Sequence, residues 1–383
     1  MKYKKLKEII EFNPQEKINK KKKYKKIKME DIKCFNKNIS QYSIEEYNGG
    51  MKFRNGDTLL ARITPCLENG KTAQVDILEE NEIGYGSSEY IVMRPKDEIS
   101  DKDYIYYLAI SPFFRDVAIK SMVGTSGRQR VQLDVLKNLE MLIPDYEIQV
   151  KIGKILSKFD EKININNKTN DNLYNICNVV FHNYIDKYSE QIEYTKIIDM
   201  ADRIITGKTP STKNEEFWNG DIPFITIPDM HNQVFTIDTE RTISKVGAKS
   251  LIPKNSISVS CIATVGLVSI STKESQTNQQ INSIVIKNAY DLYYLFEFLS
   301  EQENFMKNIA GGSTTYNINK TTFENIEVPY LPQNIVQEFH NTVCKLFDKI
   351  KLNQLENKNL EQLRDILLPK LMSGEINIDK IEI

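Results

Sequence analysis

Residues Gly207, Lys208 and Thr209 have the types and the order that end a phosphate-binding loop, and such a loop would bind a nucleotide. The complete motif is Gly-x-x-x-x-Gly-Lys-[Ser/Thr], because its first glycine turns the backbone so that successive N–H groups surround the phosphates. Here Asp202 occupies the position of the first glycine, and its carboxylate would repel phosphate. Pro210 follows where a helix should begin, and proline fits a turn better. These residues therefore argue against a nucleotide site.

Cysteine and histidine residues show no spacing typical of a metal site or a disulfide framework. The five cysteines are scattered without a Cys-x-x-Cys pair, and the three histidines form neither His-x-His nor His-Glu-x-x-His. This cysteine usage indicates a reducing compartment. No apolar run approaches the roughly 18 to 20 residues of a membrane span, and the lysine-rich N-terminus lacks the apolar part of a signal peptide. We therefore expect a cytoplasmic protein with no bound metal and no membrane partner.

The charge balance excludes a uniformly basic surface that binds polyanions without sequence preference. Lysine and arginine total 51 and aspartate and glutamate total 52, so the formal net charge is -1 at pH 7. Nucleic-acid binding must therefore come from local patches. The densest patch is KINKKKKYKKIK at residues 17–28, which is either a solvated lysine-rich segment or a phosphate contact.

One sequence pattern occurs twice in the chain, about 187 residues apart, which indicates an internal repeat. The first copy reads NLEMLIPDYEIQVKIGKILSKFDEKI from Asn138, and the second reads NIEVPYLPQNIVQEFHNTVCKLFDKI from Asn325. Each copy predicts a short strand, a proline and then a long helix with one apolar stripe. The stripe residues are Ile148, Ile152, Ile155, Phe159 and Ile163 in the first copy, and Ile335, Phe339, Val343, Leu346 and Ile350 in the second.

Each apolar stripe resumes beyond a polar interval, NINNKTNDN from Asn164 in the first copy and ENKN from Glu356 in the second. The helices are therefore predicted to span about 35 to 40 residues, or roughly 55 to 60 Å. A single stripe of that length requires a partner helix, and the other copy is the obvious partner. Two unrelated amphipathic helices are the alternative. They would not explain why a proline precedes a Phe-Asp pair by the same interval in both copies.

The regions before the two helices, each of about 140 residues, contain short β-like runs separated by Gly, Pro and Asn. The clearest runs are residues 57–63, 90–93, 256–262 and 282–286. Before its final strand each region reaches a glycine-led loop, GTSGRQRV from Gly124 and GGSTTYNI from Gly311. The loops differ in sequence although their positions match. This pattern predicts two domains with a common scaffold and different surfaces.

Together these features resemble the specificity subunit of type I restriction-modification systems. The residues GKTPS from Gly207, followed by FWNG from Phe217 and IPF from Ile222, are similar to the opening motif of a recognition domain in that family. The closing LEQLRDILLPKLMSGEI from Leu360 is similar to the end of the family's distal helix. The resemblance covers nearly the whole chain. The second half matches more closely, because the first half lacks GKTPS.

The resemblance implies an α+β fold with two globular target recognition domains in a tandem pseudo-repeat. Two long helices, pairing as an antiparallel coiled coil, would separate and join these domains. The expected ranges are 1–144 for the first domain, 145–187 for the central helix, 188–331 for the second domain, 332–376 for the distal helix and 377–383 for a tail. In this setting GKTPS is a structural loop. Phe217 and Trp218 are expected to pack against their domain and not to stack on a base.

The resemblance also implies that the chain reads a bipartite, asymmetric site on double-stranded DNA and holds catalytic partners there. These partners are DNA adenine methyltransferase subunits that use S-adenosylmethionine, with or without restriction subunits that use ATP and Mg. No cofactor is expected in this chain. It lacks the Asn- or Asp-Pro-Pro-aromatic tetrapeptide and the glycine-rich loop of an adenine methyltransferase, and it lacks Walker motifs.

Candidate DNA-reading residues lie in the matching loops and have side chains that fit base edges or phosphates. The alternative for each of them is a solvated loop residue, which is the more common role of polar side chains in loops. In the first domain they are Ser126, Arg128, Gln129 and Arg130. In the second domain they are Ser313, Thr314 and Tyr316 of the loop, with Thr277, Asn278, Gln279 and Gln280, whose amides fit adenine. Arg62, Lys71 and Lys208 are candidates for phosphate contacts.

Two other functions would explain parts of the sequence. An orphan coiled-coil adaptor without DNA specificity would explain the helices, and a nucleotide-dependent enzyme would explain residues 207–209. The enzyme hypothesis predicts ATP turnover that is lost in Lys208→Ala. The recognition hypothesis predicts that an adenine methyltransferase gene lies beside the gene for this chain.

Overall fold

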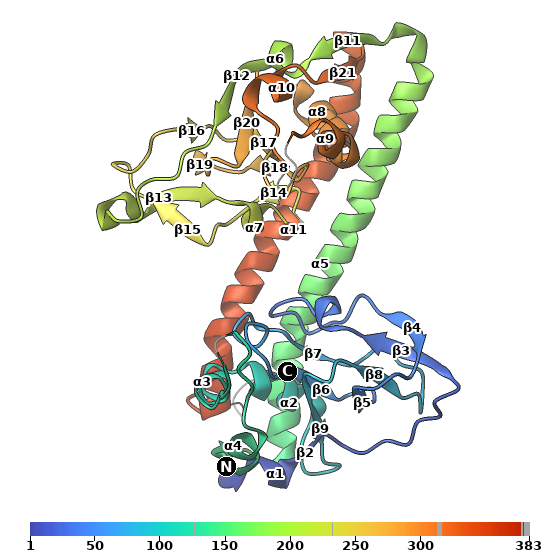
Figure 1. Ribbon diagram of the computed structural model, residues 1–383, viewed down its shortest axis with the longest axis vertical. Coiled ribbons are helices and arrows are strands. Elements are labelled where there is room, and N and C mark those ends of the chain that lie inside the picture. The colour runs from blue at the N-terminus through green and yellow to red at the C-terminus, as the bar shows by residue number, and fades with distance from the viewer. Residues whose placement is uncertain (126, 232, 312–315, 377, 379–383) are drawn as a thin grey trace. The chain divides into compact units, whose positions relative to one another are not determined.

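The helices and strands of the chain fall into two compact units (Figure 1). A computed structural model describes residues 1–383 except 126, 232, 312–315, 377 and 379–383. Unit 1 consists of Met1–Ile165 with Asn359–Ile383, and unit 2 consists of Asn166–Lys358. The division falls within the two long helices, so each long helix contributes residues to both units.

The described residues of unit 1 form two four-stranded sheets and one two-stranded sheet. The first sheet is antiparallel, with the order β2 (Ile10–Phe12), β9 (Tyr90–Pro95), β6 (Thr58–Ala61) and β7 (Thr72–Gln74). The second has the order β4 (Ser43–Glu46), β3 (Lys23–Ile27), β8 (Gly84–Gly86) and β5 (Met51–Phe53), with β3 and β8 parallel. The third pairs β1 (Lys2–Lys5) with β10 (Glu140–Ile143). The short helices are α1 (Leu6–Ile9), η1 (Met29–Asp31), α2 (Lys102–Ile110), α3 (Pro112–Lys120) and α4 (Leu133–Asn138).

Unit 2 repeats this plan with one additional strand. One sheet has the order β12 (Ala201–Thr206), β20 (Ile281–Ile286), β17 (Ile257–Ser260), β18 (Val268–Ser271) and the additional β14 (Phe235–Thr236). The other has the order β15 (Arg241–Ile243), β13 (Trp218–Ile225), β19 (Ser275–Thr277) and β16 (Leu251–Ile252). The two-stranded sheet pairs β11 (Glu193–Lys196) with β21 (Glu327–Tyr330). The short helices are η2 (Ser189–Gln191), α6 (Ile197–Met200), η3 (Glu215–Phe217), α7 (Ile227–Met230), α8 (Asp291–Ser300), α9 (Glu303–Ile309) and α10 (Lys320–Glu324).

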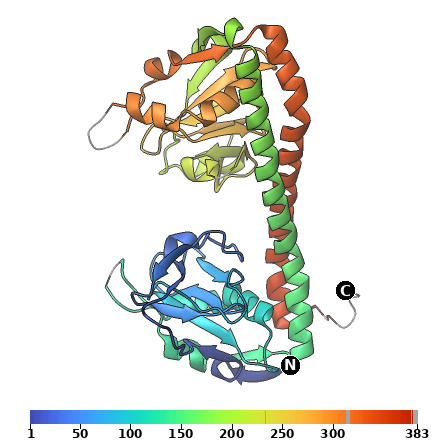
Figure 2. The same ribbon diagram turned by 90° about the vertical axis from the view of Figure 1, so that its right-hand side faces the viewer.

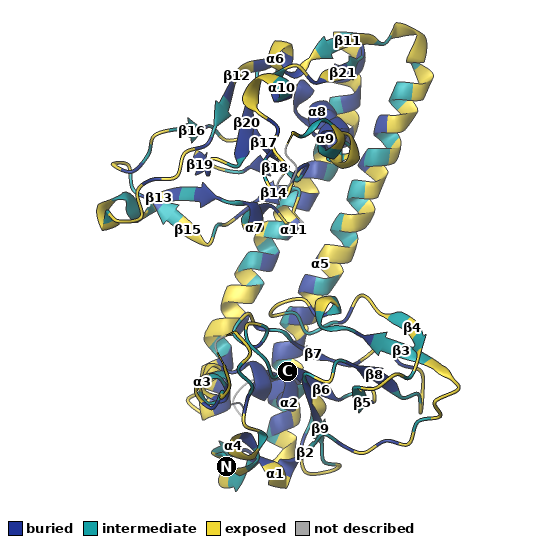
Figure 3. Cartoon of the chain, in the orientation of Figure 1, coloured by how far each residue is buried: buried dark blue, intermediate teal, exposed yellow. Residues whose placement is uncertain are grey.

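The sheets of the two units correspond strand by strand, and the predicted internal repeat is therefore confirmed. The four β-like runs of the sequence form β6, β9, β17 and β20, which pair as β6–β9 in unit 1 and β17–β20 in unit 2. The parallel pair β3–β8 corresponds to the parallel pair β13–β19. Each unit buries one helix rich in aromatic residues beside its sheet, α2 with KDYIYYLAI and α8 with DLYYLFEFLS (Figure 3).

The two predicted long helices are α5 (Tyr146–Lys187, 42 residues) and α11 (Gln333–Ser373, 41 residues). They pack against each other and run antiparallel (Figure 2). Within unit 2, Asn170 of α5 bonds to Asn353 of α11, whereas Tyr184, further along α5, bonds to the earlier Glu338. The stripe residues are largely buried in the cores of their units. The predicted partnership of the two helical copies is therefore confirmed.

The polar intervals of the two helices face each other inside unit 2. The Asn166 amide donates to the Asn357 side-chain oxygen at 2.8 Å, and the Asn357 amide donates to Asn167 at 2.8 Å. The Asn353 amide donates to the Asn170 side-chain oxygen, also at 2.8 Å. Asn166 and Asn353 are 3% and 2% exposed. Because a buried amide without a partner is costly, these bonds favour this register of the helices over shifted ones.

Candidate nucleic-acid interface

The glycine-led loop of unit 1 is closed at its base by two backbone hydrogen bonds. Val123 N donates to Arg130 O at 3.0 Å, and Arg130 N donates to Val123 O at 2.8 Å. Gly124 has a φ of 136°, which favours glycine, and a Cβ there would lie 2.8 Å from Arg128 O. The described residues 124, 125 and 127–129 therefore belong to a loop that is closed at its base.

This loop is attached to two other segments of unit 1. Thr64 N donates to Gln129 O at 3.0 Å, and Val131 N donates to Arg62 O at 2.9 Å. Arg62 N in turn donates to Glu89 O at 2.9 Å. Residues 62–64 follow strand β6 and residues 87–89 follow strand β8, so the ends of two sheets and the loop meet here.

Unit 2 contains the same three-segment junction. Ala263 N donates to Tyr316 O at 3.0 Å, and Ile318 N donates to Cys261 O at 2.9 Å. Cys261 N donates to Gln280 O at 2.8 Å. Gly311 and Asn317 exchange two backbone bonds of 3.0 Å, as Val123 and Arg130 do in unit 1. The structure therefore brings the loop that begins at Gly311 together with Thr277–Gln280, two segments that the sequence singled out separately.

The junction of unit 1 carries a cluster of charged side chains. Arg130 Nε and Nη2 lie 2.9 and 2.6 Å from the two carboxylate oxygens of Glu89. Arg62 Nε lies 3.3 Å from the same carboxylate. Hydrogen bonds from Arg130, followed by its charge and that of Arg62, lower the pKa of Glu89 although partial burial opposes this. Glu89 is therefore ionised at neutral pH and holds both guanidinium groups at the surface.

The other predicted residues of unit 1 occupy different environments. Arg128 is exposed on the loop, and Gln129 is half-buried at its base. Lys71 Nζ donates to Met29 O at 2.6 Å, which fixes that ammonium group within unit 1. Ser126 lies outside the described residues.

In unit 2 the predicted residues range from buried to exposed. Thr277 is fully buried in β19, and Asn278 is 9% exposed with its amide donating to the Gln280 side chain at 3.0 Å. Gln279 and Lys208 are exposed, as is Tyr316, and Gln280 is half-buried. Ser313 and Thr314 lie outside the described residues.

The sequence alone did not indicate the segment Ser87, Ser88 and Glu89. In the structure it is the counterpart of Asn278, Gln279 and Gln280, because β8 and β19 hold matching places in their sheets. Ser88 is exposed, and Ser87 and Glu89 are half-buried. A signal was present, since the segment directly precedes the β-like run 90–93, as 277–280 precedes 282–286.

The GKTPS segment is a structural loop, as predicted. Gly207 N donates to Ile281 O at 3.0 Å, and a Cβ at Gly207 would lie 2.1 Å from Asn278 O. The Gln276 amide donates to Lys208 O at 2.7 Å. No helix follows Thr209 in residues 210–214, which are all described. The segment therefore packs against Thr277–Gln280 and does not form a phosphate-binding loop.

Trp218 packs against its own domain, also as predicted. Its ring lies edge-to-face with Phe224, with centroids 5.2 Å apart, and its Nε1 donates to Ser211 O at 3.1 Å. The guanidinium carbon of Arg241 lies 3.5 Å from the Trp218 ring centroid. Trp218 therefore joins β13 and β15 to the end of the GKTPS loop.

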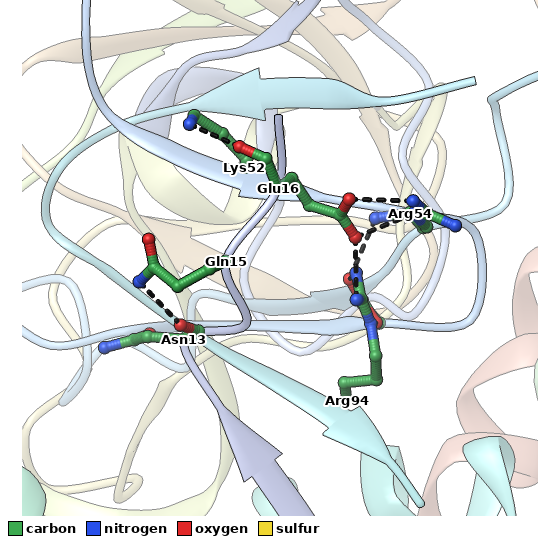
Figure 4. A network of polar contacts seen from close by, with 7 residues as sticks. Asn13, Gln15, Glu16, Lys52, Arg54 and Arg94 are labelled. Atoms are coloured by element: carbon green, nitrogen blue, oxygen red, sulfur yellow. Dashed lines mark hydrogen bonds and ion pairs between the residues drawn. The ribbon is translucent and has the colours of Figure 1, made fainter. Parts of the chain in front are cut away.

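In unit 1, which lacks GKTPS, an ion-pair network fixes the chain that leads from β2 to β3 (Figure 4). The Glu16 carboxylate accepts from Arg54 Nη2 at 2.8 Å and from Arg94 Nη1 at 2.7 Å. Arg94 also binds Asp57 through two bonds of 2.8 and 2.7 Å. Lys52 Nζ donates to the backbone oxygen of Glu16 at 2.6 Å. In unit 1, charged side chains thus fix the chain segment that the close packing of Gly207 and Pro210 fixes in unit 2.

The basic run at residues 17–28 contributes to the surface only in part. Lys20–Lys23 are exposed in the segment before and at the start of β3. Lys25 lies 3.2 Å from Glu82, and Lys26 lies 2.7 Å from Glu45, so these two are neutralised. A recess of about 420 Å³ beside the run is lined by Lys26, Lys28, Met29, Asn48, Gly49, Gly50, Gly86, Ser87 and Ser88. The run and the segment 87–89 therefore border one recess.

Glu16→Gln is expected to lower the free energy of unfolding by about 1 to 3 kcal/mol, because the Glu16 side chain is 6% exposed and accepts charged hydrogen bonds. Burial raises the pKa of Glu16, but hydrogen bonds from Arg54 and Arg94 outweigh burial and lower it overall. The contribution of Glu16 is therefore present above the ordinary glutamate pKa of about 4.3 and is lost as the pH falls through the lowered value.

Denaturant unfolding of the two proteins at pH 7 and at about pH 3 measures this contribution. The difference between wild type and Glu16→Gln should narrow at the lower pH. Glu11→Gln, at an exposed position of the neighbouring strand β2, is the control and should stay within about 0.5 kcal/mol of wild type. A Glu16→Gln protein as stable as wild type at pH 7 would show that the network does not stabilise the loop.

Within the described residues, no three His, Cys, Asp or Glu side chains are grouped as a metal site would require. Over the same part of the chain, none of the helices has both the length and the apolar character needed to cross a membrane. The five cysteines, all described, are free.

Comparison with known proteins gives matches across both units. Residues 1–175 and 189–363 each match the family described as Type I restriction modification DNA specificity domain. The Type I restriction enzyme HindI specificity subunit of Haemophilus influenzae is 32% identical, over 84% of this chain and 87% of that protein. The Type I restriction enzyme MjaIX specificity subunit of Methanocaldococcus jannaschii is 33% identical over 47% of this chain and 43% of its own length. The crystal structure of a type I restriction-modification system S subunit from M. genitalium has the same fold, with a TM-score of 0.58 and 15% identity over 97% of this chain and 96% of that one.

Proposed function

The chain belongs to the family of type I restriction-modification DNA specificity subunits, and we propose that its two units read the two halves of one asymmetric DNA site. A specificity subunit is a non-catalytic part of the restriction-modification enzyme complex. The observation that carries the proposal is the repeated junction, in which the same backbone bonds position different side chains in the two units. Two similar scaffolds with different reading side chains fit two different half-sites.

The partners in this proposal are double-stranded DNA and DNA adenine methyltransferase subunits, with or without restriction subunits. S-adenosylmethionine, and ATP with Mg where restriction occurs, would be bound by those partners. Five free cysteines support a reducing, cytoplasmic setting. An adaptor without DNA specificity is the alternative. It would not require the two loops to differ while their anchoring bonds are matched.

Co-expression of the chain with its methyltransferase subunits, followed by single-molecule mapping of methylated adenines, tests the proposal. We expect a bipartite, non-palindromic methylated sequence with a spacer of constant length. The matched control is expression of the methyltransferase subunits without this chain. Methylation without a sequence preference in the complete complex would favour the adaptor.

Arg128→Ala and Gln280→Ala are each expected to relax one half of the recognised sequence and leave the other half unchanged. Arg128 is exposed on the loop of unit 1, and Gln280 lies in the junction of unit 2. Loss of a bidentate base contact costs about 1 to 3 kcal/mol in discrimination. Methylation mapping of each variant complex measures the change. Uniformly weaker binding to every sequence would instead identify a phosphate contact.

A further inference from the structure

Three positions of unit 1 correspond to three positions of unit 2 through their backbone hydrogen bonds. The backbone N–H of Arg62 donates to Glu89 O, and the backbone oxygen of Arg62 accepts from Val131 N. In the same way, the backbone N–H of Cys261 donates to Gln280 O, and the backbone oxygen of Cys261 accepts from Ile318 N. Arg130 closes its loop against Val123, as Asn317 closes its loop against Gly311. The matched triad is therefore residues 62, 89 and 130 in unit 1 and residues 261, 280 and 317 in unit 2.

The matched triad of unit 1 is charged and faces the surface. The side chains of Arg62, Glu89 and Arg130 are 35%, 24% and 42% exposed. Arg130 uses Nε and Nη2 on the Glu89 carboxylate, so that the remaining N–H groups on Nη1 and Nη2 point away from it. Donors in this arrangement fit O6 and N7 of guanine in the major groove. The carboxylate holds the guanidinium group in place before DNA is bound, which lowers the entropy cost of binding.

The matched triad of unit 2 is neutral. Cys261 is 2% exposed, and its sulfur accepts from the Asn282 amide at 3.3 Å, so it faces inward. Gln280 has its backbone N–H bonded to the Asn278 side chain at 3.0 Å, and Asn317 is exposed. Side-chain amides of glutamine and asparagine pair with N6 and N7 of adenine. Of the matched positions, residues 62 and 130 thus carry guanine-type donors in unit 1, and residues 280 and 317 carry adenine-type amides in unit 2.

We propose that the matched triad determines specificity in each unit, with Arg130 and Arg62 reading a guanine in the half-site of unit 1 and Gln280 and Asn317 reading an adenine in that of unit 2. Glu89 is a positioning residue, because it acts through the two arginines. The inference rests on the proposed function, since it presumes that each unit reads a half-site. The inference goes beyond the proposed function by naming the base in each half-site and the residues that read it.

The test uses the full chain assembled with its methyltransferase subunits and a pool of randomised duplexes from which bound sequences are selected. Arg130→Gln is expected to reduce the preference for guanine at one base pair of the first half-site by roughly 5- to 150-fold, the usual range for one bidentate contact. The second half-site should be unchanged. Lys120→Gln, at a 74% exposed side chain of unit 1, is the matched control and should leave both half-sites unchanged.

Two further variants separate reading from folding. Glu89→Gln should weaken the preference at the same base pair, because Arg130 and Arg62 lose their common carboxylate. The triple change Arg62→Cys, Glu89→Gln and Arg130→Asn gives the matched triad of unit 1 the same three residue types as the triad of unit 2. It should move the preference at that base pair toward adenine. If Arg130→Gln does not assemble, Glu89→Gln provides the same readout.

The outcomes distinguish this inference from the proposed function. If the wild-type complex selects no sequence, the proposed function fails. If the wild-type complex selects a bipartite site but the triad variants bind every sequence equally less well, these arginines contact phosphates and the inference is overturned. Unchanged preference at every base pair would overturn it as well.

Discussion

Asp160→Ala is expected to lower the free energy of unfolding by about 3 to 5 kcal/mol, the usual cost of removing one partner from a buried ion pair. Arg364 Nη1 lies 2.5 Å from the Asp160 carboxylate, and these two side chains are 6% and 8% exposed. The Tyr107 hydroxyl donates to the other oxygen of Asp160. Burial raises the pKa of Tyr107 well above its ordinary value, so the phenol remains a donor. Loss of the carboxylate would leave a buried guanidinium group with the exposed Asp365 as its remaining acidic partner.

Denaturant unfolding of Asp160→Ala and of two companion variants measures this effect. Asp348→Ala is the matched control, because Asp348 follows Phe347 in α11 as Asp160 follows Phe159 in α5. Asp348 is exposed, so its change should be within about 0.5 kcal/mol. The double change of Asp160 and Arg364 to leucine should cost less than Asp160→Ala, since it leaves no unpaired charge. Equal effects of Asp160→Ala and Asp348→Ala would contradict the prediction.

Inserting four residues after Asn167 and four after Asn357 is expected to lengthen the spacer of the recognised DNA by one to two base pairs. The insertions add about 6 Å to each helix at 1.5 Å per residue. A base step is about 3.4 Å, which gives the expected range. Both insertions lie in the facing asparagine intervals, so pairing can resume on each side. Methylation mapping of the co-expressed complex would measure the spacer.

A seven-residue insertion at both positions is the matched comparison. Seven residues restore the apolar repeat more closely than four, and they add about 10.5 Å, or roughly three base steps. Four residues inserted in α5 alone should abolish recognition, because the asparagine pairs and the stripe would then fall out of register. Unchanged spacing after both insertions, with both half-sites still read, would show that helix length does not set the distance.

The long helices and the repeat could be predicted because their signals are local in the sequence. Apolar residues three or four apart define one helix face whatever the rest of the chain does, and alternation of short apolar runs with turn residues defines strands. The predicted run 90–93 lies within strand β9, and strand β17 lies within the predicted run 256–262. The structural role of GKTPS could also be predicted, because two nearby residues, Asp202 and Pro210, are incompatible with a phosphate-binding loop.

The partners of individual charged residues could not be predicted from the sequence. Arg130 was proposed as a base-reading residue, but its pairing with Glu89 depends on two chain segments 41 residues apart meeting at the sheet ends. Thr277 was proposed with the residues that follow it, yet it is fully buried because it ends strand β19. Whether either residue touches DNA remains a prediction. How far Arg130 and Thr277 are exposed at the surface depends on the fold.

The asparagine intervals show most directly which features are local to one helix and which depend on how two helices pack. Composition and periodicity are properties of each segment alone, so they are enough to predict two amphipathic helices that polar residues interrupt. Only the antiparallel packing decided that Asn166 meets Asn357 and Asn170 meets Asn353. In the same way it decided that Asp160 is buried against Arg364 while Asp348, in the same local pattern, faces solvent. The physical reason is that periodicity specifies which side of a helix is apolar, whereas the pairing of polar groups depends on the register between segments almost 200 residues apart.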